Sequence, residues 1–165
     1  MMAAAPVELA STLFQVKRFG KAHPVIVVED SDEDFDTVLR AATLAGVQHD
    51  IRRASTGDEC LQLLRGLASQ SRAQAALVLL DLNTPQGDGR DALALIHEDA
   101  LLSAIPLVVL STSANPRDVD FCYAHGANAY HVKPVSHGEH LMVLQTLFTY
   151  WLGTVVLPTE RSLER

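Results

Sequence analysis

Five polar side chains, placed at the ends of short apolar runs, could together bind a metal ion and accept a phosphoryl group. They are Glu29, Asp30, Asp81, Ser111 and Lys133. A cluster of carboxylates suits a hard cation. Mg²⁺ is favoured because it binds through one or two carboxylates and takes waters and phosphate oxygens as its other ligands. A carboxylate can also attack phosphorus and form an aspartyl phosphate. These residue types therefore predict Mg²⁺-dependent phosphoryl transfer to a carboxylate.

Each of these side chains has a place in such a reaction. Asp81 would be the attacking carboxylate. Lys133 would neutralise charge on the transferring group, and Ser111 would donate a hydrogen bond to a phosphoryl oxygen. Glu29 and Asp30 would repel Asp81 if the three were crowded together without a cation. Their grouping is therefore a second reason to expect a metal site.

Simpler interpretations of the single residues remain open. Glu29 and Asp30 could favour the start of a helix near Ser31, because acidic residues interact well with helix N-termini. Asp81 could be a turn residue that leads into 83–87, which reads Asn-Thr-Pro-Gln-Gly. Neither interpretation explains why carboxylates, a hydroxyl and an ammonium group all follow apolar runs.

The apolar runs themselves predict a parallel sheet. Three are continuous, at 25–28, 75–80 and 106–110, and two weaker strands are expected near 50–53 and at 129–132. Continuous apolar strands are typical of a sheet that is covered on both faces. Segments with helical spacing alternate with the strands, so we expect a doubly wound α/β fold with five parallel strands and helices on both faces. Ligands of such sheets bind at the carboxyl ends of the strands, where the five polar residues lie.

Composition excludes several other classes of protein. The 165 residues argue for one domain, and a net charge of −7 argues against nucleic acid as a direct partner. Cys60 and Cys122 form no Cys-x-x-Cys motif, which excludes a cysteine zinc site and fits a reducing compartment. The sequence has neither a leader pattern nor an apolar run of roughly 20 residues. We therefore expect a cytoplasmic protein that does not contact a membrane.

The motifs at the strand ends resemble the receiver domains of two-component response regulators. They are Glu29-Asp30, Leu79-Leu80-Asp81-Leu82-Asn83-Thr84-Pro85, Gly87-Asp88-Gly89, Ser111-Thr112-Ser113 and Tyr130-His131-Val132-Lys133-Pro134. The resemblance implies a flavodoxin-like sheet with the strand order 2-1-3-4-5. It also implies a receiver domain at 24–152, between an N-terminal extension at 1–23 and a C-terminal tail at 153–165 that holds no output domain.

The resemblance assigns roles around the expected metal ion. Asp81 would be the phosphoacceptor. Asp30 and Asp81 would bind Mg²⁺ through their carboxylates, and the backbone carbonyl of Asn83 would be a third protein ligand. Glu29 would act next to the ion, through water. The protein would catalyse only its own phosphoryl transfer and dephosphorylation, so it would not be an enzyme in the usual sense.

The resemblance also implies a switch. Lys133 would pair first with Asp81 and then with the phosphoryl group. Ser111 would move toward a phosphoryl oxygen, and Tyr130 would swing inward after it. Many family members carry threonine where this chain has Ser111, and serine keeps the hydroxyl. The span at 66–76 is longer than in the shortest members, so an enlarged loop is expected there.

The implied partners are a kinase and a second copy of the chain. A sensor histidine kinase would donate the phosphoryl group. The segments 81–93 and 150–158 resemble those of small regulators paired with bacterial phytochromes. This narrower resemblance implies a bacteriophytochrome as the kinase and a homodimer formed through the fourth helix, the fifth strand and the fifth helix. The aromatic residues expected to contribute to that surface or to the core are Phe121, Tyr123, Phe148, Tyr150 and Trp151.

Two other functions stay open. The chain could be a pseudo-receiver, an interaction module that never takes phosphate, although such modules have usually lost one of the acidic or lysine residues. It could also be an aspartyl-phosphate phosphatase. Those enzymes place the nucleophile after the first strand and a second aspartate two residues later, whereas Asp81 follows the third strand and is followed by Asn83. Stoichiometric phosphorylation without turnover would separate the three.

Overall fold

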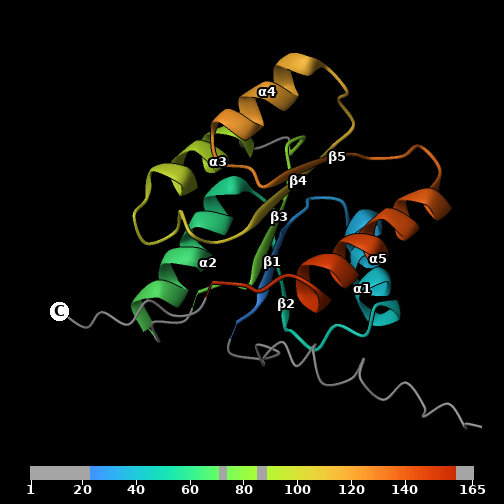
Figure 1. Cartoon of the computed structure of the whole chain (residues 1–165), viewed down its shortest axis with the longest axis horizontal. Helices are drawn as coiled ribbons and strands as arrows, with labels where there is room; N and C mark the ends of the chain where they lie inside the picture. Colours follow the sequence, from blue (N-terminus) through green and yellow to red (C-terminus); the bar gives the residue numbers. More distant parts are fainter. Residues whose placement is uncertain (1–22, 71–73, 85–88, 159–165) are drawn as a thin grey trace, which may run out of the picture.

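In the computed structural model, residues 23–70, 74–84 and 89–158 are described, and within them five parallel strands alternate with five helices (Figure 1). The strands are β1 (Val25–Val28), β2 (Ile51–Ala54), β3 (Leu77–Asp81), β4 (Leu107–Ser111) and β5 (Ala129–Val132). The helices are α1 (Asp32–Leu44), α2 (Gly57–Gln70), α3 (Gly89–Glu98), α4 (Pro116–Ala124) and α5 (His137–Gly153). The alternation confirms the predicted fold class. None of these helices has both the length and the apolar character needed to cross a lipid bilayer.

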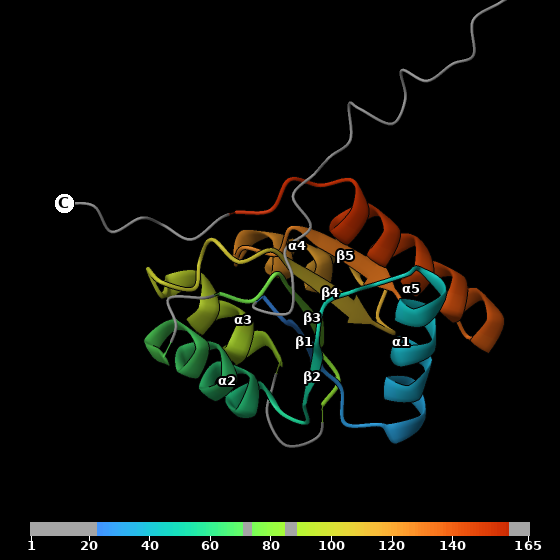
Figure 2. The same cartoon turned by 90° about the horizontal axis from the view of Figure 1, so that it is seen from below.

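The sheet has the order β2-β1-β3-β4-β5, which confirms the predicted topology. Helices α1 and α5 cover one face, while α2, α3 and α4 cover the other (Figure 2). All strand pairs are parallel, and Val28 lies opposite Leu80. Asp81 lies opposite Leu110, and Ser111 lies opposite Val132. This register brings the carboxyl ends of β1, β3, β4 and β5 to one edge of the sheet.

Each face of the sheet has its own apolar core. Strands β1, β3 and β4 are buried along their whole length, as their continuous apolar sequences predict. The buried thiols of Cys60 and Cys122 belong to the core under α2, α3 and α4, and burial raises the pKa of Cys60 to about 12. The outer edge of the sheet, formed by β5 and covered by α4, packs less tightly on the cores, because β5 has no buried residue and α4 buries only Cys122.

The structure corrects several local expectations. Strand β2 begins at Ile51, one residue later than predicted, and β3 and β4 include Asp81 and Ser111 as their last residues. Helix α2 continues to Gln70, so the enlarged loop expected from 66 onward was wrong for its first residues. Residues 71–73 lie outside the described part of the chain.

The two predicted terminal segments are described only in part. Of the extension at 1–23, only His23 lies within the described residues. The start of the tail folds back over the lower edge of the molecule, where Leu157 is buried and Gln74 Nε2 donates to the carbonyl of Pro158 at 3.2 Å. Residues 159–165 lie outside the described part.

Candidate functional site

Three of the predicted acidic residues meet at the carboxyl edge of the sheet. Glu29 and Asp30 follow β1, and Asp81 ends the neighbouring strand β3. One carboxylate oxygen from each of the three lies within 4.8 Å of the others. Glu29 and Asp81 are buried, whereas Asp30 is exposed. This set of oxygen donors fits a hard divalent cation that keeps part of its water shell.

The helix that follows β1 is capped by a different residue from those considered in the simpler interpretation. Ser31 is the N-cap of α1, and its hydroxyl accepts a hydrogen bond from the amide of Asp34 at 3.2 Å. Glu29 Oε1 accepts from the amide of Ser31 at 3.1 Å and so supports the turn that enters the helix. Helix capping therefore accounts for Ser31 and leaves the carboxylates of Glu29 and Asp30 directed at the edge of the sheet.

Lys133 is the cation of this cluster. Its Nζ lies 2.8 Å from Asp81 Oδ2, 3.0 Å from Glu29 Oε2 and 3.2 Å from Asp34 Oδ2. The lysine amide donates to the carbonyl of Ser111 at 2.7 Å, which continues the hydrogen bonding between β4 and β5 past the end of the strand. The bond to Pro134 is trans. Sequence reasoning predicted the pairing with Asp81 but missed the one with Asp34.

Burial and charge act in opposite directions on these groups. Burial raises the pKa of Glu29, and attraction to Lys133 lowers it by less, so the net pKa of Glu29 is raised. Burial lowers the pKa of Lys133, but hydrogen bonding and attraction to Asp81 and Glu29 raise it by more, so the net pKa of Lys133 is raised. The lysine is thus firmly charged, while one carboxylate more is buried than a single ammonium group can compensate.

Glu29→Gln should therefore stabilise the metal-free protein. Because the pKa of Glu29 is raised in the folded state, its ionised form costs stability at neutral pH, and this cost disappears only as acid protonates it. We expect a gain of about 1 kcal/mol in the free energy of unfolding in EDTA. The same variant should gain less stability from added Mg²⁺ than the wild type.

Urea denaturation in EDTA and in Mg²⁺ measures both effects. Glu33→Gln is the matched control, since Glu33 is an exposed residue in the first turn of α1. If Glu29→Gln had a lower free energy of unfolding than the wild type in EDTA, the cluster would not contain an excess of buried negative charge.

Ser111 and Tyr130 share a partner. The buried hydroxyl of Ser111 accepts from the amide of Ser113 at 3.1 Å, and the hydroxyl of Tyr130 donates to the carbonyl of Ser113 at 2.8 Å. Tyr130 itself is half-buried. Any movement of Ser111 away from the Ser113 amide therefore disturbs the residue that holds the Tyr130 ring. The predicted switch residues are connected through one residue that sequence reasoning did not select.

Asn83 forms the rim of the site. Its amide donates to Asp81 Oδ1 at 2.9 Å, and its side-chain Nδ2 donates to Thr112 Oγ1 at 3.0 Å. Both carboxylate oxygens of Asp81 thus have a donor, one from Asn83 and one from Lys133. The ligand role of the Asn83 carbonyl stays a prediction.

Helix α3 begins directly against the backbone of Asp81, at a glycine. A Cβ atom at Gly89 would lie 2.9 Å from the carbonyl oxygen of Asp81 and 3.0 Å from the Cα of Leu82. Because both neighbours are backbone atoms, they cannot move aside without shifting the end of β3. Gly89→Ala is therefore expected to lower the free energy of unfolding by about 1–3 kcal/mol, as overpacking does.

Urea denaturation tests this, with Gly66→Ala as the control. Gly66 lies inside α2, and its Cβ would have no neighbour within 4 Å. Alanine there should raise stability by up to about 1 kcal/mol, because glycine is a poor helix former. Equal effects of the two substitutions would show that Gly89 is not confined.

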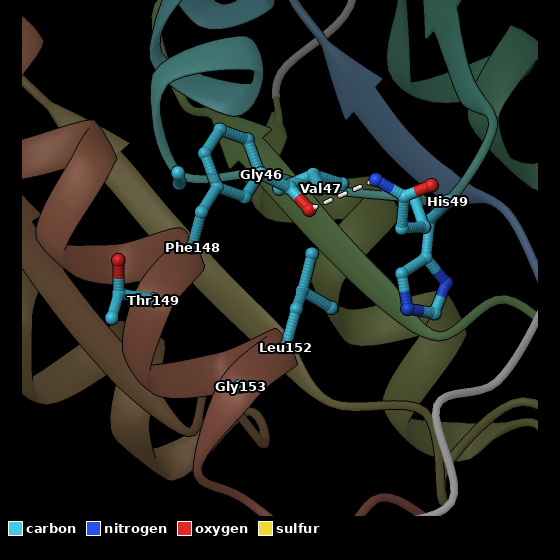
Figure 3. Close-up of a pocket in the computed structure, with 9 residues that line it drawn as sticks. Gly46, Val47, His49, Phe148, Thr149, Leu152 and Gly153 are labelled. Atoms are coloured by element: carbon cyan, nitrogen blue, oxygen red, sulfur yellow. Dashed lines mark hydrogen bonds between the residues drawn. The ribbon is translucent and has the colours of Figure 1, made fainter.

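A pocket elsewhere in the molecule has a different character. It lies between the end of α1 and the end of α5, and Figure 3 shows Val47, His49, Phe148 and Leu152 around it. Two of its lining residues are joined by a hydrogen bond of 3.3 Å from Gln48 Nε2 to the carbonyl of Gly46. Its lining has no carboxylate and no lysine. This pocket therefore lacks the carboxylate and ammonium groups that the expected chemistry needs.

The sequence and the fold of this chain are similar to those of known response regulators. Residues 25–145 match the family model of the response regulator receiver domain. The chain is 33% identical over 135 residues to response regulator Rcp1 of Synechocystis sp., over 81% of this chain and 92% of Rcp1. The crystal structure of the phosphorylated cyanobacterial phytochrome response regulator RcpA is 34% identical, with a TM-score of 0.76 over 83% of this chain and 99% of RcpA.

A second crystal structure bears on the metal site. The Mn²⁺-bound form of Rcp1 is 32% identical to this chain, with a TM-score of 0.76 over 83% of this chain and 99% of that one. Its fold therefore corresponds to the one described above, and the ion bound to Rcp1, Mn²⁺, is a divalent cation. From the matched family model and this level of identity, the chain belongs to the family of response regulator receiver domains.

Proposed function

We propose that this protein accepts a phosphoryl group on Asp81 from a sensor histidine kinase, with Mg²⁺ bound beside it, and signals by a change of conformation. The observation that carries the proposal is the contact of the Lys133 ammonium group, on a side chain only 9% exposed, with Asp81 at 2.8 Å and Glu29 at 3.0 Å. A nucleophile, its cation and a set of metal ligands are the parts that phosphoryl transfer to a carboxylate needs.

The proposed reaction gives Asp81, Lys133, Ser111 and the other two carboxylates each a role. An oxygen of Asp81 attacks the phosphorus of a phosphohistidine, so that an O–P bond forms while the N–P bond breaks and the histidine leaves. Lys133 moves from the carboxylate to a phosphoryl oxygen, and Ser111 donates to another. Asp30, Asp81 and the carbonyl of Asn83, with Glu29 through water, would hold the divalent ion, which when bound would supply positive charge to the phosphoryl oxygens. The chain transfers a phosphoryl group only to and from itself.

The surface formed by α4, β5 and α5 is proposed to pass the conformational signal on to a partner. To reach the phosphoryl group, the Ser111 hydroxyl breaks its hydrogen bond with the Ser113 amide. The hydrogen bond between the Tyr130 hydroxyl and the Ser113 carbonyl changes as a result. Phe148 is buried in the core and takes no part in this surface. Large apolar side chains that are exposed on these elements are Tyr123, Val132, Met142 and Tyr150. They support a homodimer as the form in which the signal is passed on, and sedimentation velocity before and after phosphorylation measures it.

A photoreceptor kinase is the proposed donor. RcpA is described as a cyanobacterial phytochrome response regulator, and this chain is 34% identical to it. A purified bacteriophytochrome kinase, incubated with this chain and labelled ATP in red and in far-red light, tests the pairing. Transfer that depends on light supports it, and transfer from unrelated histidine kinases at the same rate speaks against it.

The test of the main proposal is intact mass after incubation with acetyl phosphate, with Mg²⁺ or with EDTA. We expect one phosphoryl adduct that forms only with Mg²⁺. No adduct under any condition would identify a pseudo-receiver. Continuous release of phosphate from a monoester such as p-nitrophenyl phosphate would identify a phosphatase.

A further inference from the structure

Arg53, in the edge strand β2, binds the backbone that carries two of the acidic residues. Its Nε donates to the carbonyl of Glu29 at 2.8 Å, and its Nη2 donates to the carbonyl of Asp30 at 2.9 Å. Its Nη1 donates to the carboxylate of Asp32 at 2.6 Å. The guanidinium carbon also lies 5.0 Å from the centre of the Phe35 ring. All three nitrogens of this side chain therefore hold the turn between β1 and α1.

These contacts fix the direction of the side chains in the turn. The amide of Glu29 donates to the carbonyl of Ala54 at 2.9 Å, so Glu29 is bound to β2 on both sides, through its amide and through Arg53. Asp30 is exposed, and its carbonyl is fixed by the same guanidinium. Because the backbone decides where each Cβ points, Arg53 sets the directions in which both carboxylates project toward Asp81.

Only an arginine can make this arrangement. The planar fork presents its donors at fixed angles to two carbonyls and a carboxylate, whereas the ammonium group of a lysine is a single point. The next residue along the strand offers a comparison. Arg52 is exposed, and its nearest acidic partner is Asp50 at 4.0 Å. The two arginines carry the same charge, and only Arg53 touches the turn.

The charge of Arg53 acts against a bound cation. A guanidinium bound to the carbonyls of Glu29 and Asp30 repels a divalent ion held by the same two residues, so loss of the charge alone would strengthen Mg²⁺ binding. Loss of the fixed turn would weaken binding, because the ligands would then have to be ordered when the ion binds. The two effects have opposite signs and can be told apart.

We propose that Arg53 is a positioning residue that pre-organises Glu29 and Asp30 for Mg²⁺. The inference rests on the proposed function, because it concerns the same metal site. It adds a residue of the edge strand that lies outside the acidic cluster and orients the metal ligands through the backbone of Glu29 and Asp30.

Isothermal titration with Mg²⁺ on the whole chain tests this inference, using the wild type, Arg53→Ala, Arg53→Lys and Arg52→Ala. We expect Arg53→Ala to bind Mg²⁺ at least about 10-fold more weakly, as is usual when a residue that orients metal ligands is lost. Arg53→Lys should also bind more weakly, which assigns the effect to the fork, since its charge is kept. Arg52→Ala should keep the wild-type affinity.

Each other outcome has a definite meaning. Equal or tighter binding by Arg53→Ala would overturn the inference. So would unfolding of both Arg53 variants in EDTA, seen by circular dichroism, because Arg53 would then support the fold and not the site. A wild type that binds no Mg²⁺ would remove the proposed metal site itself. Wild-type binding with unchanged Arg53 variants would remove only the role of Arg53.

Discussion

Asp81→Asn is expected to take up no phosphoryl group from acetyl phosphate or from a kinase, while the wild type takes up one. The amide of asparagine is not a nucleophile, and among the described residues no other carboxylate has the same place at the end of a buried strand with Lys133 at 2.8 Å. The fold should persist, because asparagine has nearly the same shape and still accepts from the amide of Asn83. Intact mass spectrometry and circular dichroism measure the two properties.

The control for this substitution is Asp91→Asn. Asp91 lies exposed in the first turn of α3 and has no part in the cluster, so its variant should be phosphorylated like the wild type. An adduct of the same stoichiometry on Asp81→Asn would show that another residue accepts the phosphoryl group. Peptide mapping would then locate it.

Lys133→Met should have the largest effect on stability. Its ammonium group contacts three carboxylates, and the side chains of Glu29 and Asp81 are only 4% and 6% exposed. Removing the cation leaves both without a counter-charge, a change that costs about 3–5 kcal/mol in buried pairs. Urea denaturation in EDTA measures this loss. Mg²⁺ should restore part of it, because a divalent ion bound to the same carboxylates replaces the lost charge.

The pH dependence of the difference identifies its origin. Burial alone would lower the pKa of Lys133, but Asp81 and Glu29 raise it overall. Its contribution is therefore complete below the ordinary lysine value of about 10.4 and is lost only as the pH rises above it. The difference in free energy of unfolding between the wild type and Lys133→Met should thus be constant between neutral pH and about pH 9. Arg52→Ala, which removes an exposed charge, should show almost no gap at any pH.

Strands with continuous apolar sequences were the most predictable part of the fold. Strands β1, β3 and β4 are buried on both faces. Every residue in them lies in an apolar environment, and their sequences are therefore continuous apolar runs. The edge strand β2 is half-exposed and contains two arginines, which explains why its start was misplaced by one residue.

The site was predictable where a residue follows directly from a strand. Asp81 and Lys133 were found in this way, because parallel strands bring their carboxyl ends together. Asp34 and Arg53 were not, since an acid in the first turn of a helix and an arginine on an edge strand have ordinary explanations. Their roles come from tertiary contacts: Asp34 meets Lys133 across 99 positions of the chain, and Arg53 meets Glu29 across 24. Local sequence carries no sign of either contact.

The thin edge of the sheet has a consequence for the cost of signalling. Strand β5 contributes no buried residue and α4 contributes only Cys122, so this edge can tilt while most of the two apolar cores keeps its contacts. Moving a helix of the central core would open cavities, at about 24 cal/mol for each Å³. Besides the pairing of β5 with β4, Ser111 and Ser113 link Asp81's side of the sheet to Tyr130 by side-chain hydrogen bonds of about 1 kcal/mol each. Under the proposed function, a phosphoryl group on Asp81 that drew Ser111 away from Ser113 would act on these two contacts first, and the rest of the sheet would serve as a rigid base.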